Sequence, residues 1–333
     1  MLRYAFMSAL VMAAIMLVPS GHARSADELV VYSGRKENAI KPVVEAFQKQ
    51  TGIAVRLKTG PTCGLANEII QEKTRPLGDV FIATEVGVME ILSKKDVLEP
   101  YFSPAGRDLG PGLRATHGRW TGISSRARVL IYNRNLVADK DVPRSVFQLT
   151  DPKWKGKIAI ASTRERTTLS WVASLVALKG RDGTKDYLTR LIANGLTILP
   201  DNTEVWQGVG RGEFALGLTN SPNYFLARKA NYPVGVIYPA QEDGGVGTLL
   251  NLNAAAVIKG GPNPDAAKRF IDFLLAPEGQ RILIDGAYEI PLRPDIIDSS
   301  PLTGFQRMAV TELQLAELEE PTLKLLADMS PRW

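Results

Sequence analysis

Short apolar runs alternate along the chain with segments in which apolar residues recur every three or four positions. The run 29–32 is followed by apolar residues at Ile40, Val43 and Phe47, and a second run begins at Ile53. Short runs predict buried strands, whereas the three-to-four spacing predicts helices that bury one face. Because this alternation continues through much of the chain, it predicts an α/β fold with a largely parallel sheet and short crossovers.

Small hydrogen-bonding residues follow many of the predicted strands. Thr84 and Glu85 come after the run 79–82, and the run 214–218 leads into a polar stretch before Tyr224. In open α/β sheets, ligands bind outside the carboxyl ends of the strands, where helix N-termini present free N–H groups. We therefore expect one cleft lined by Ser33, Arg35, Lys36, Glu85, Ser162, Thr163, Arg164, Asn202, Asn220, Ser221, Asn223 and Tyr224.

Some of these residues also have simpler interpretations. Tyr224 fits the pattern of a surface aromatic residue with its hydroxyl in water as well as that of a cleft residue. Glu85 is a candidate ligand and equally an acid that stabilises the start of a helix through its dipole. Arg126 and Arg128 lie in an extended segment, and we expect them to serve the connection between lobes.

The N-terminus predicts export. Arg3 precedes the apolar stretch 5–18, and small residues lead up to Ala23. This arrangement is typical of a signal peptide, and its apolar core is too short for a stable transmembrane helix. We expect cleavage after Ala23, with residues 1–23 as the signal peptide and the mature chain in the periplasm. Cys63 is the one cysteine, so the exported chain has no internal disulfide.

Charge and motifs exclude several classes of function. The formal charge is +5, and removal of residues 1–23 takes away only Arg3, which leaves +4. The basic residues are spread along the chain, without the dense block that is typical of nucleic-acid binding. The sequence lacks the G-x-S-x-G, H-E-x-x-H and P-loop motifs. We therefore expect no nucleic-acid partner, no catalytic cofactor and no enzymatic activity.

Two extended segments, 125–132 and 247–253, divide the chain into two lobes of ordinary domain size. We predict that they form paired hinge strands near 126–132 and 247–253. Residues 24–127 together with 252–333 would then form the first lobe, and residues 128–251 the second. Such an arrangement allows the lobes to close around a ligand between them.

Five motifs keep the order and spacing of a known family. They are 31–35 (V-Y-S-G-R), 78–81 (G-D-V-F), 125–129 (S-R-A-R-V), 151–157 (D-P-K-W-K-G-K) and 247–250 (G-T-L-L). In these motifs the mature chain resembles the periplasmic iron(III)-binding proteins, which are the solute-binding components of ABC importers. The resemblance implies the two-lobed type II periplasmic-binding-protein fold, an inner-membrane permease as partner and a monomeric carrier.

The resemblance also implies a metal site for Fe³⁺ as cargo. Members of the family hold the metal with tyrosine phenolates, often together with a histidine and a glutamate. By position, Tyr224 matches the first tyrosine of an adjacent pair, and Glu85 matches the carboxylate. The sequence departs from the family at Phe225, which replaces the second tyrosine, and in the loop 34–37, which has no histidine.

A small synergistic anion completes the metal shell in this family. Ser162, Thr163, Arg164 and Asn202 lie where the family binds its anion, and Arg35 and Lys36 are further candidates for anion contacts. Relatives with the same frame carry phosphonates and other organic anions. A carrier of phosphonate, phosphate or a carboxylate is therefore the alternative, and a sensory module that presents its closed state to a membrane receptor is another.

Overall fold

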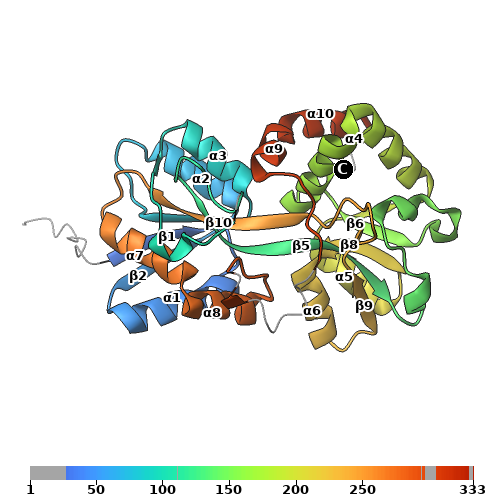
Figure 1. Cartoon of the computed structure of the whole chain (residues 1–333), viewed down its shortest axis with the longest axis horizontal. Helices are drawn as coiled ribbons and strands as arrows, with labels where there is room; N and C mark the ends of the chain where they lie inside the picture. Colours follow the sequence, from blue (N-terminus) through green and yellow to red (C-terminus); the bar gives the residue numbers. More distant parts are fainter. Residues whose placement is uncertain (1–27, 111, 294, 297–304, 330–332) are drawn as a thin grey trace, which may run out of the picture.

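The computed structural model describes residues 28–110, 112–293, 295–296, 305–329 and 333. Two α/β halves lie side by side, and long strands pass from one half to the other (Figure 1). The predicted signal peptide lies outside the described residues. In the part of the chain that is described, no helix combines the length and the apolar character needed to cross a membrane.

Two antiparallel strands connect the halves. They are β5 (Thr121–Asn133) and β10 (Leu250–Ile258), which pair from Ala127 opposite Leu250 to Thr121 opposite Ala255. Beyond Ala127, β5 continues into the second half, where it pairs with other strands. Both strands are almost entirely buried, as expected for strands covered on both faces.

The first half is built on the strand order β2-β1-β3-β10, with β4 beside β10. β1 is parallel to β2 and β3, whereas β10 is antiparallel to β3. The other strands of this half are β1 (Glu28–Ser33), β2 (Ala54–Thr59), β3 (Val80–Ala83) and β4 (Leu98–Glu99). Its helical segments are α1 (Glu37–Thr51), α2 (Thr62–Gln71), α3 (Val86–Lys94), η1 (Pro104–Gly106), α7 (Pro264–Leu275) and α8 (Pro277–Ala287).

In the second half, β8 joins β5 to the parallel pair β6 and β7, and β9 also pairs with β5. These strands are β6 (Ile158–Ala161), β7 (Thr197–Leu199), β8 (Leu216–Asn220) and β9 (Val234–Ile237). The helical segments are η2 (Asp139–Asp141), η3 (Val146–Thr150), η4 (Pro152–Trp154), α4 (Arg166–Ala193), α5 (Asn202–Arg211) and α6 (Ser221–Lys229). The helix α4 is interrupted at Gly180, where φ is 68°.

The segment 305–329, which we call the C-terminal strap, contacts both halves. Its helices are α9 (Glu312–Glu317) and α10 (Glu319–Met329). α9 packs mainly on α3 and also touches α4, and α10 packs along α4, as Figure 1 shows. The predicted assignment of residues 252–333 to the first lobe did not include this contact of α10 with the second half. The lobe boundaries themselves stay a prediction.

The helix α1 shows how the sequence pattern produces the core. Ile40, Val43 and Phe47 are fully buried against the sheet, and the helix ends at Gly52, whose φ of 72° lies in the left-handed region that glycine enters at little cost. The Phe47 ring makes edge contacts with Phe270 at 4.9 Å and Phe273 at 5.6 Å between centroids. Residues more than two hundred positions apart therefore share one core.

Replacement of Phe47 tests this core. Phe47→Ala removes a fully buried ring, and the cavity that it leaves should lower the free energy of unfolding by about 3–5 kcal/mol. Urea denaturation followed by circular dichroism measures the change. Phe102→Ala is the control, because that ring is 57% exposed, and it should change stability by less than about 0.5 kcal/mol. Equal effects of the two variants would contradict the packing described here.

Candidate ligand-binding cleft

Glu85 forms part of the cleft wall that the first half supplies. It lies between the end of β3 and the start of α3, and only 6% of it is exposed. The hydroxyl of Thr84 donates a hydrogen bond of 2.6 Å to Oε2, while the buried Oε1 accepts none. Burial raises the pKa of Glu85, and the Thr84 hydrogen bond and the nearby Arg166 and Arg126 oppose that shift. The result is a sequestered carboxylate with one free oxygen.

A guanidinium from the second half reaches this carboxylate. Arg166, in the first turn of α4, places Nε 3.7 Å from Glu85 Oε1 and also forms an ion pair with Glu319 of α10. The exposed thiol of Cys63 lies within electrostatic reach of all three charges. Arg126 of β5 donates a hydrogen bond to the carbonyl oxygen of Thr84. The two halves and the strap therefore meet around Glu85.

The predicted anion contact Arg35 is bound within the first half. Its Nη1 lies 2.7 Å from Glu289 Oε2, and both side chains are buried. Ser124 donates to the same carboxylate and accepts a hydrogen bond of 2.9 Å from Asn253. The buried Ser33 hydroxyl accepts the backbone N–H of Arg35. The neighbouring Lys36, in contrast, is exposed.

Arg128 organises the second half of the cleft. Its Nη1 donates to the side-chain oxygens of Asn202 at 3.0 Å and Asn220 at 3.1 Å, and its Nη2 donates to the Thr168 hydroxyl at 2.9 Å. No carboxylate lies within ion-pair distance of Arg128 among the described residues. Burial without such a partner lowers the pKa of Arg128 to about 9. Two predicted cleft residues on different elements are thus held by one cation.

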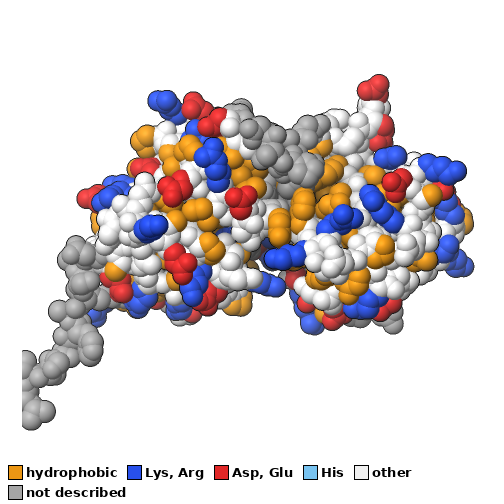
Figure 2. Space-filling view, turned by 90° about the horizontal axis from the view of Figure 1, so that it is seen from below, with side chains coloured by type: hydrophobic (Ala, Val, Ile, Leu, Met, Phe, Trp, Pro, Cys, Tyr) orange, Lys and Arg blue, Asp and Glu red, His pale blue; other side chains and the backbone are white. Residues whose placement is uncertain are grey.

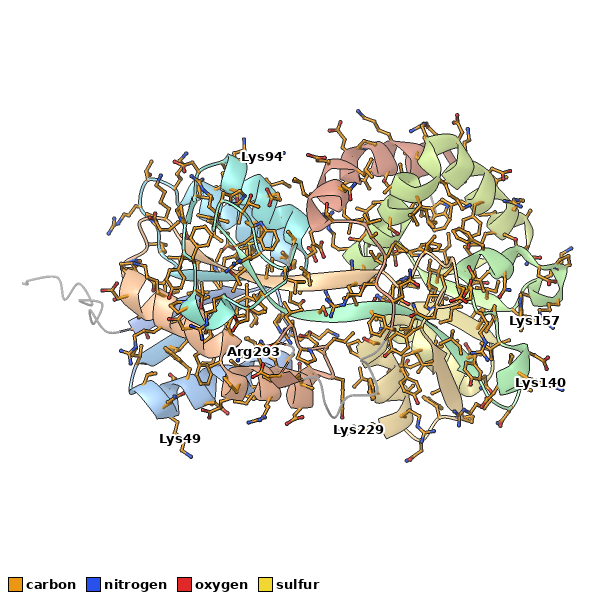
Figure 3. All side chains as sticks on the ribbon, in the orientation of Figure 1. Lys49, Lys94, Lys140, Lys157, Lys229 and Arg293 are labelled. Carbon is orange, nitrogen blue, oxygen red and sulfur yellow. The ribbon has the colours of Figure 1, made fainter. Side chains whose placement is uncertain are left out.

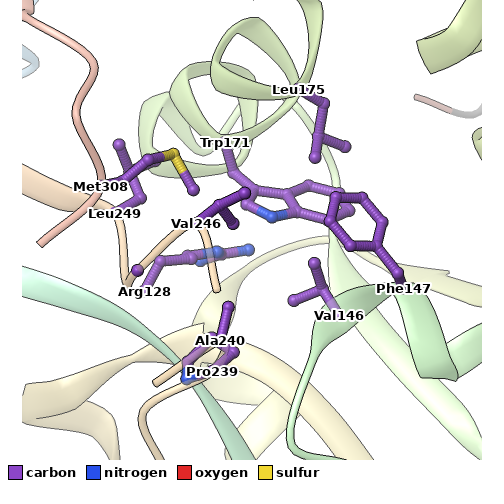
Figure 4. A pocket seen from close by; sticks show the side chains of 11 residues that line it. Arg128, Val146, Phe147, Trp171, Leu175, Pro239, Ala240, Val246, Leu249 and Met308 are labelled. Atoms are coloured by element: carbon purple, nitrogen blue, oxygen red, sulfur yellow. The ribbon is translucent and has the colours of Figure 1, made fainter. Parts of the chain in front are cut away.

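Arg128 also borders a small cavity of about 10 Å³, large enough for little more than one water molecule. Trp171, Leu175 and Phe147 form apolar walls of the cavity, and Figure 4 shows the Trp171 ring above the Arg128 guanidinium and the Phe147 ring to one side. The buried Nε of Arg128 has no hydrogen-bond partner in the described part of the chain. This cavity lies inside the second half and is too small for a polyatomic anion.

The loop after β6 carries three further predicted residues. Ser162 is buried, and its hydroxyl donates to the carbonyl oxygen of Pro200 at 3.1 Å. Thr163 is partly buried, and Arg164 is exposed. The side chain of Glu165 accepts a hydrogen bond of 2.8 Å from the Asn202 amide, which links this loop to the Arg128 network.

The start of α6 carries the remaining candidates. The hydroxyl of Ser221 accepts the backbone N–H of Ala127, and the Asn223 amide donates to Thr219 at 2.6 Å. Tyr224 is half-buried and packs against an apolar cluster of the second half that contains Trp206.

The ring of Phe225, next along α6, crosses to the first half. It stacks on Tyr288 with a centroid distance of 5.3 Å, and it also meets the Tyr224 ring edge-on at 5.2 Å. Tyr288 follows α8 with a φ of 52°. The position where the family places a second tyrosine is therefore used for an aromatic contact between the halves.

The structure brings some predicted residues together and leaves others apart. Asn202 and Asn220 meet at Arg128, whereas no hydrogen bond joins Tyr224 to Glu85 among the described residues. Histidine, cysteine, aspartate and glutamate form no metal-binding cluster of three or more there. The roles of Tyr224 and Glu85 as metal ligands therefore stay a prediction, as do the roles of the anion-binding residues.

Three charged residues at the cleft were missed by the sequence reasoning: Arg166, Glu289 and Glu319. Arg166 follows Arg164 at the same strand-to-helix junction, so its position could have been noticed. Glu289 and Glu319 lie far along the chain from their partners, and no local pattern marks them.

The surface agrees with a cleft between the halves. Seen from below, the molecule is hollowed between them, and basic side chains border the hollow (Figure 2). Other basic residues, such as Lys49, Lys140 and Lys229, point outward from the periphery of both halves (Figure 3). The charge is thus spread over the surface rather than gathered in one patch.

Residues 43–306 match the family model of bacterial extracellular solute-binding proteins. The chain belongs to this family. It is 31% identical over 306 residues to the major ferric iron-binding protein of Neisseria meningitidis serogroup A, which covers 89% of this chain and 91% of that protein. Members of the family are carriers and not enzymes, which confirms the expectation that this solute-binding protein has no enzymatic activity.

Solved structures show the same fold. Iron-bound HitA from Pseudomonas aeruginosa has a TM-score of 0.83 and 28% identity, and the match covers 91% of this chain and 99% of that one. The Trichodesmium protein IdiA (FutA), in complex with iron and citrate, has a TM-score of 0.81 and 26% identity with the same coverage. The predicted type II periplasmic-binding-protein fold is therefore confirmed for this solute-binding protein.

The buried pair of Arg35 and Glu289 gives a stability test. Glu289→Gln leaves the guanidinium of Arg35 buried without a counter-charge, which should lower the free energy of unfolding by about 3–5 kcal/mol. The double variant Arg35→Met with Glu289→Leu removes both charges and should be closer to wild type. Urea denaturation measures both, with the exposed pair Asp186 and Arg190 as the control, whose Asp186→Asn variant should cost at most about 0.5 kcal/mol. A double variant as unstable as the single one would contradict this account.

Proposed function

We propose that this solute-binding protein carries ferric iron through the periplasm to the permease of an ABC importer. The observation that carries the proposal is a buried carboxylate at the meeting point of the two halves, Glu85, with one oxygen free of hydrogen bonds. The likeness over most of the chain to a ferric iron-binding protein and to iron-bound HitA supports the same cargo.

The chemistry of the proposed ligands suits Fe³⁺. This small, highly charged ion favours anionic oxygen ligands. A free tyrosine loses its proton near pH ~10, but a bound cation dominates the local field and displaces that proton at neutral pH. We infer that Tyr224 supplies a phenolate and Glu85 a carboxylate when the lobes close. With Phe225 in place of a second phenol, the remaining coordination positions go to water or to oxygens of an anion.

The anion would bind on the second half. Asn202 faces the cleft network, and Ser162, Thr163 and Arg164 lie on the loop just before α4, whose N-terminus favours negative charge. Arg35 and Lys36 lie on the opposite half as further anion contacts, and Ser33, Asn220, Ser221 and Asn223 line the rest of the cleft. A synergistic anion would thus supply metal ligands in addition to the two from the protein, Tyr224 and Glu85.

Export and release complete the proposal. The predicted signal peptide, 1–23, delivers the chain to the periplasm, where a monomer closes about β5 and β10 as hinge strands. Residues 24–127 and 252–333 form one lobe, and residues 128–251 form the other. The open form then releases iron to the permease.

The iron proposal has a direct spectroscopic test. Wild-type protein mixed with ferric citrate should develop a visible charge-transfer band from phenolate to iron, and Tyr224→Phe should lose it. Tyr101→Phe is the control, because that hydroxyl binds Asp272 in the first half and should leave the band unchanged. Absence of a band in the wild type would show that iron is not bound through tyrosine.

An oxyanion carrier is the second candidate, favoured by the three arginines that converge on the cleft. Arg126, Arg128 and Arg166 contact residues of the cleft wall, and guanidinium groups bind oxyanions well. Such a carrier would not need a metal.

Calorimetry in metal-free buffer separates the two candidates. If the cargo is iron, phosphate, 2-aminoethylphosphonate and citrate should bind more weakly than about 1 mM, which corresponds to roughly −4 kcal/mol. Addition of ferric iron should then strengthen anion binding, because the metal supplies charge to the anion site. Micromolar binding of one of these anions without metal would support the oxyanion carrier instead.

A further inference from the structure

The position of Arg166 suggests a role that neither the fold nor the family assigns. It comes from the second half, yet its Nε lies 3.7 Å from Glu85 Oε1 in the first half. That distance is too long for a hydrogen bond, and Oε1 has no other partner. The guanidinium thus faces the one carboxylate oxygen that the proposed cargo would use, at ion-pair distance but without a hydrogen bond to it.

Glu319 holds the guanidinium at this distance. It pairs with Nη2 of Arg166, and both side chains are about three-quarters buried. Its Oε2 also lies over the first turn of α3, where a Cβ on Gly87 would come within 3.3 Å of it. The N-terminus of a helix favours a carboxylate. Glu319 is therefore stabilised at this position both by its ion pair with Arg166 and by the dipole of α3. A Cβ at position 87 would therefore require Glu319 Oε2 to shift by a few tenths of an ångström.

We propose that Arg166 is an internal cation that competes with the cargo for Glu85, and that Glu319 sets the outcome by holding Arg166 away from the free oxygen. The inference rests on the proposed role of Glu85 as a metal ligand. When Arg166 pairs with Glu319, Glu85 is available to iron. When Arg166 turns to Glu85, it replaces the charge of the metal and favours release.

This mechanism makes the two members of one ion pair act in opposite directions. Arg166→Gln removes the competitor, so iron should bind more tightly and leave more slowly. Glu319→Gln frees Arg166 to pair with Glu85, so iron should bind more weakly and leave faster. We expect changes of roughly three- to ten-fold, in the range of partly buried charge pairs. A purely structural ion pair would shift binding in the same direction whichever partner is removed.

The matched controls come from the same two helices. Arg181 of α4 and Asp328 of α10 form an exposed ion pair of 2.8 Å that also links α4 to α10. Arg181→Gln and Asp328→Asn therefore weaken the same helix contact without changing the charges at Glu85. Neither should alter iron affinity or release.

Cys63 supplies a readout that does not depend on iron. Partial burial raises the pKa of its thiol, Arg166 lowers that pKa, and Glu85 and Glu319 raise it. In metal-free protein, alkylation of this single cysteine by iodoacetamide should slow in Arg166→Gln and accelerate in Glu319→Gln at pH 8. The reagent is uncharged, so the rates report on the thiolate and not on attraction of the reagent.

The experiment combines both readouts on the full mature chain. Iron affinity is measured by competition with citrate, release by transfer to a chelator, and alkylation by mass spectrometry. Opposite shifts in the two variants, with unchanged controls, are the expected result. If the wild type binds iron but both variants shift affinity in one direction, this inference is wrong. If the wild type binds no iron while the alkylation rates change as expected, the charge arrangement stands and the proposed cargo is wrong.

Discussion

The antiparallel pairing of β5 with β10 is the constraint on which the cleft depends. Side chains two residues apart on a strand point to the same face, so Ser124, Arg126 and Arg128 form a row along β5. Ser124 joins the Arg35–Glu289 pair, Arg126 reaches the end of β3, and Arg128 holds the asparagines of the second half. A shift of one residue in the register of β5 against β10 would turn this row to the other face of the sheet and break all three contacts.

Three of the arginines at the cleft, Arg35, Arg128 and Arg166, have their charges balanced in different ways. Arg35 has a buried carboxylate of its own, while Arg128 has only amide and hydroxyl oxygens. Arg166 is shared between two carboxylates from different parts of the chain. A bonded pair such as that of Arg35 fixes structure, because breaking it leaves a buried charge. A shared cation can exchange partners at lower cost, and this difference is why Arg166 rather than Arg35 is suited to respond to cargo.

Local sequence patterns were enough for the α/β class and for part of the cleft, whereas the type II fold was predicted from the resemblance to a known family. The helical spacing of Ile40, Val43 and Phe47 predicted a buried face that the structure confirms, and the match of residues 43–306 to the family model confirms the family. The strand-end rule brought Asn202 and Asn220 into one cleft, where they do meet. The rule locates the ends of strands, but it says nothing of which charges pair there.

The charge pairs could not be predicted, because they join residues that lie far apart in the sequence and no local pattern marks such partners. Arg35 and Glu289 are 254 positions apart, and Arg166 and Glu319 are 153 apart. The helix α10 likewise buries one face, with Thr322, Leu325 and Leu326, but that spacing does not identify α4 as the helix on which it packs.

The crossing of the chain between the halves has a consequence for biogenesis. β3 pairs with β10, and Val80 lies opposite Val257. Because Val257 is synthesised 177 residues after Val80, the sheet of the first half stays incomplete until most of the chain has been made. An N-terminal fragment would expose an unpaired strand edge. Neither half can therefore be produced by a single cut in the gene, because the sheet of the first half combines strands from both ends of the described chain.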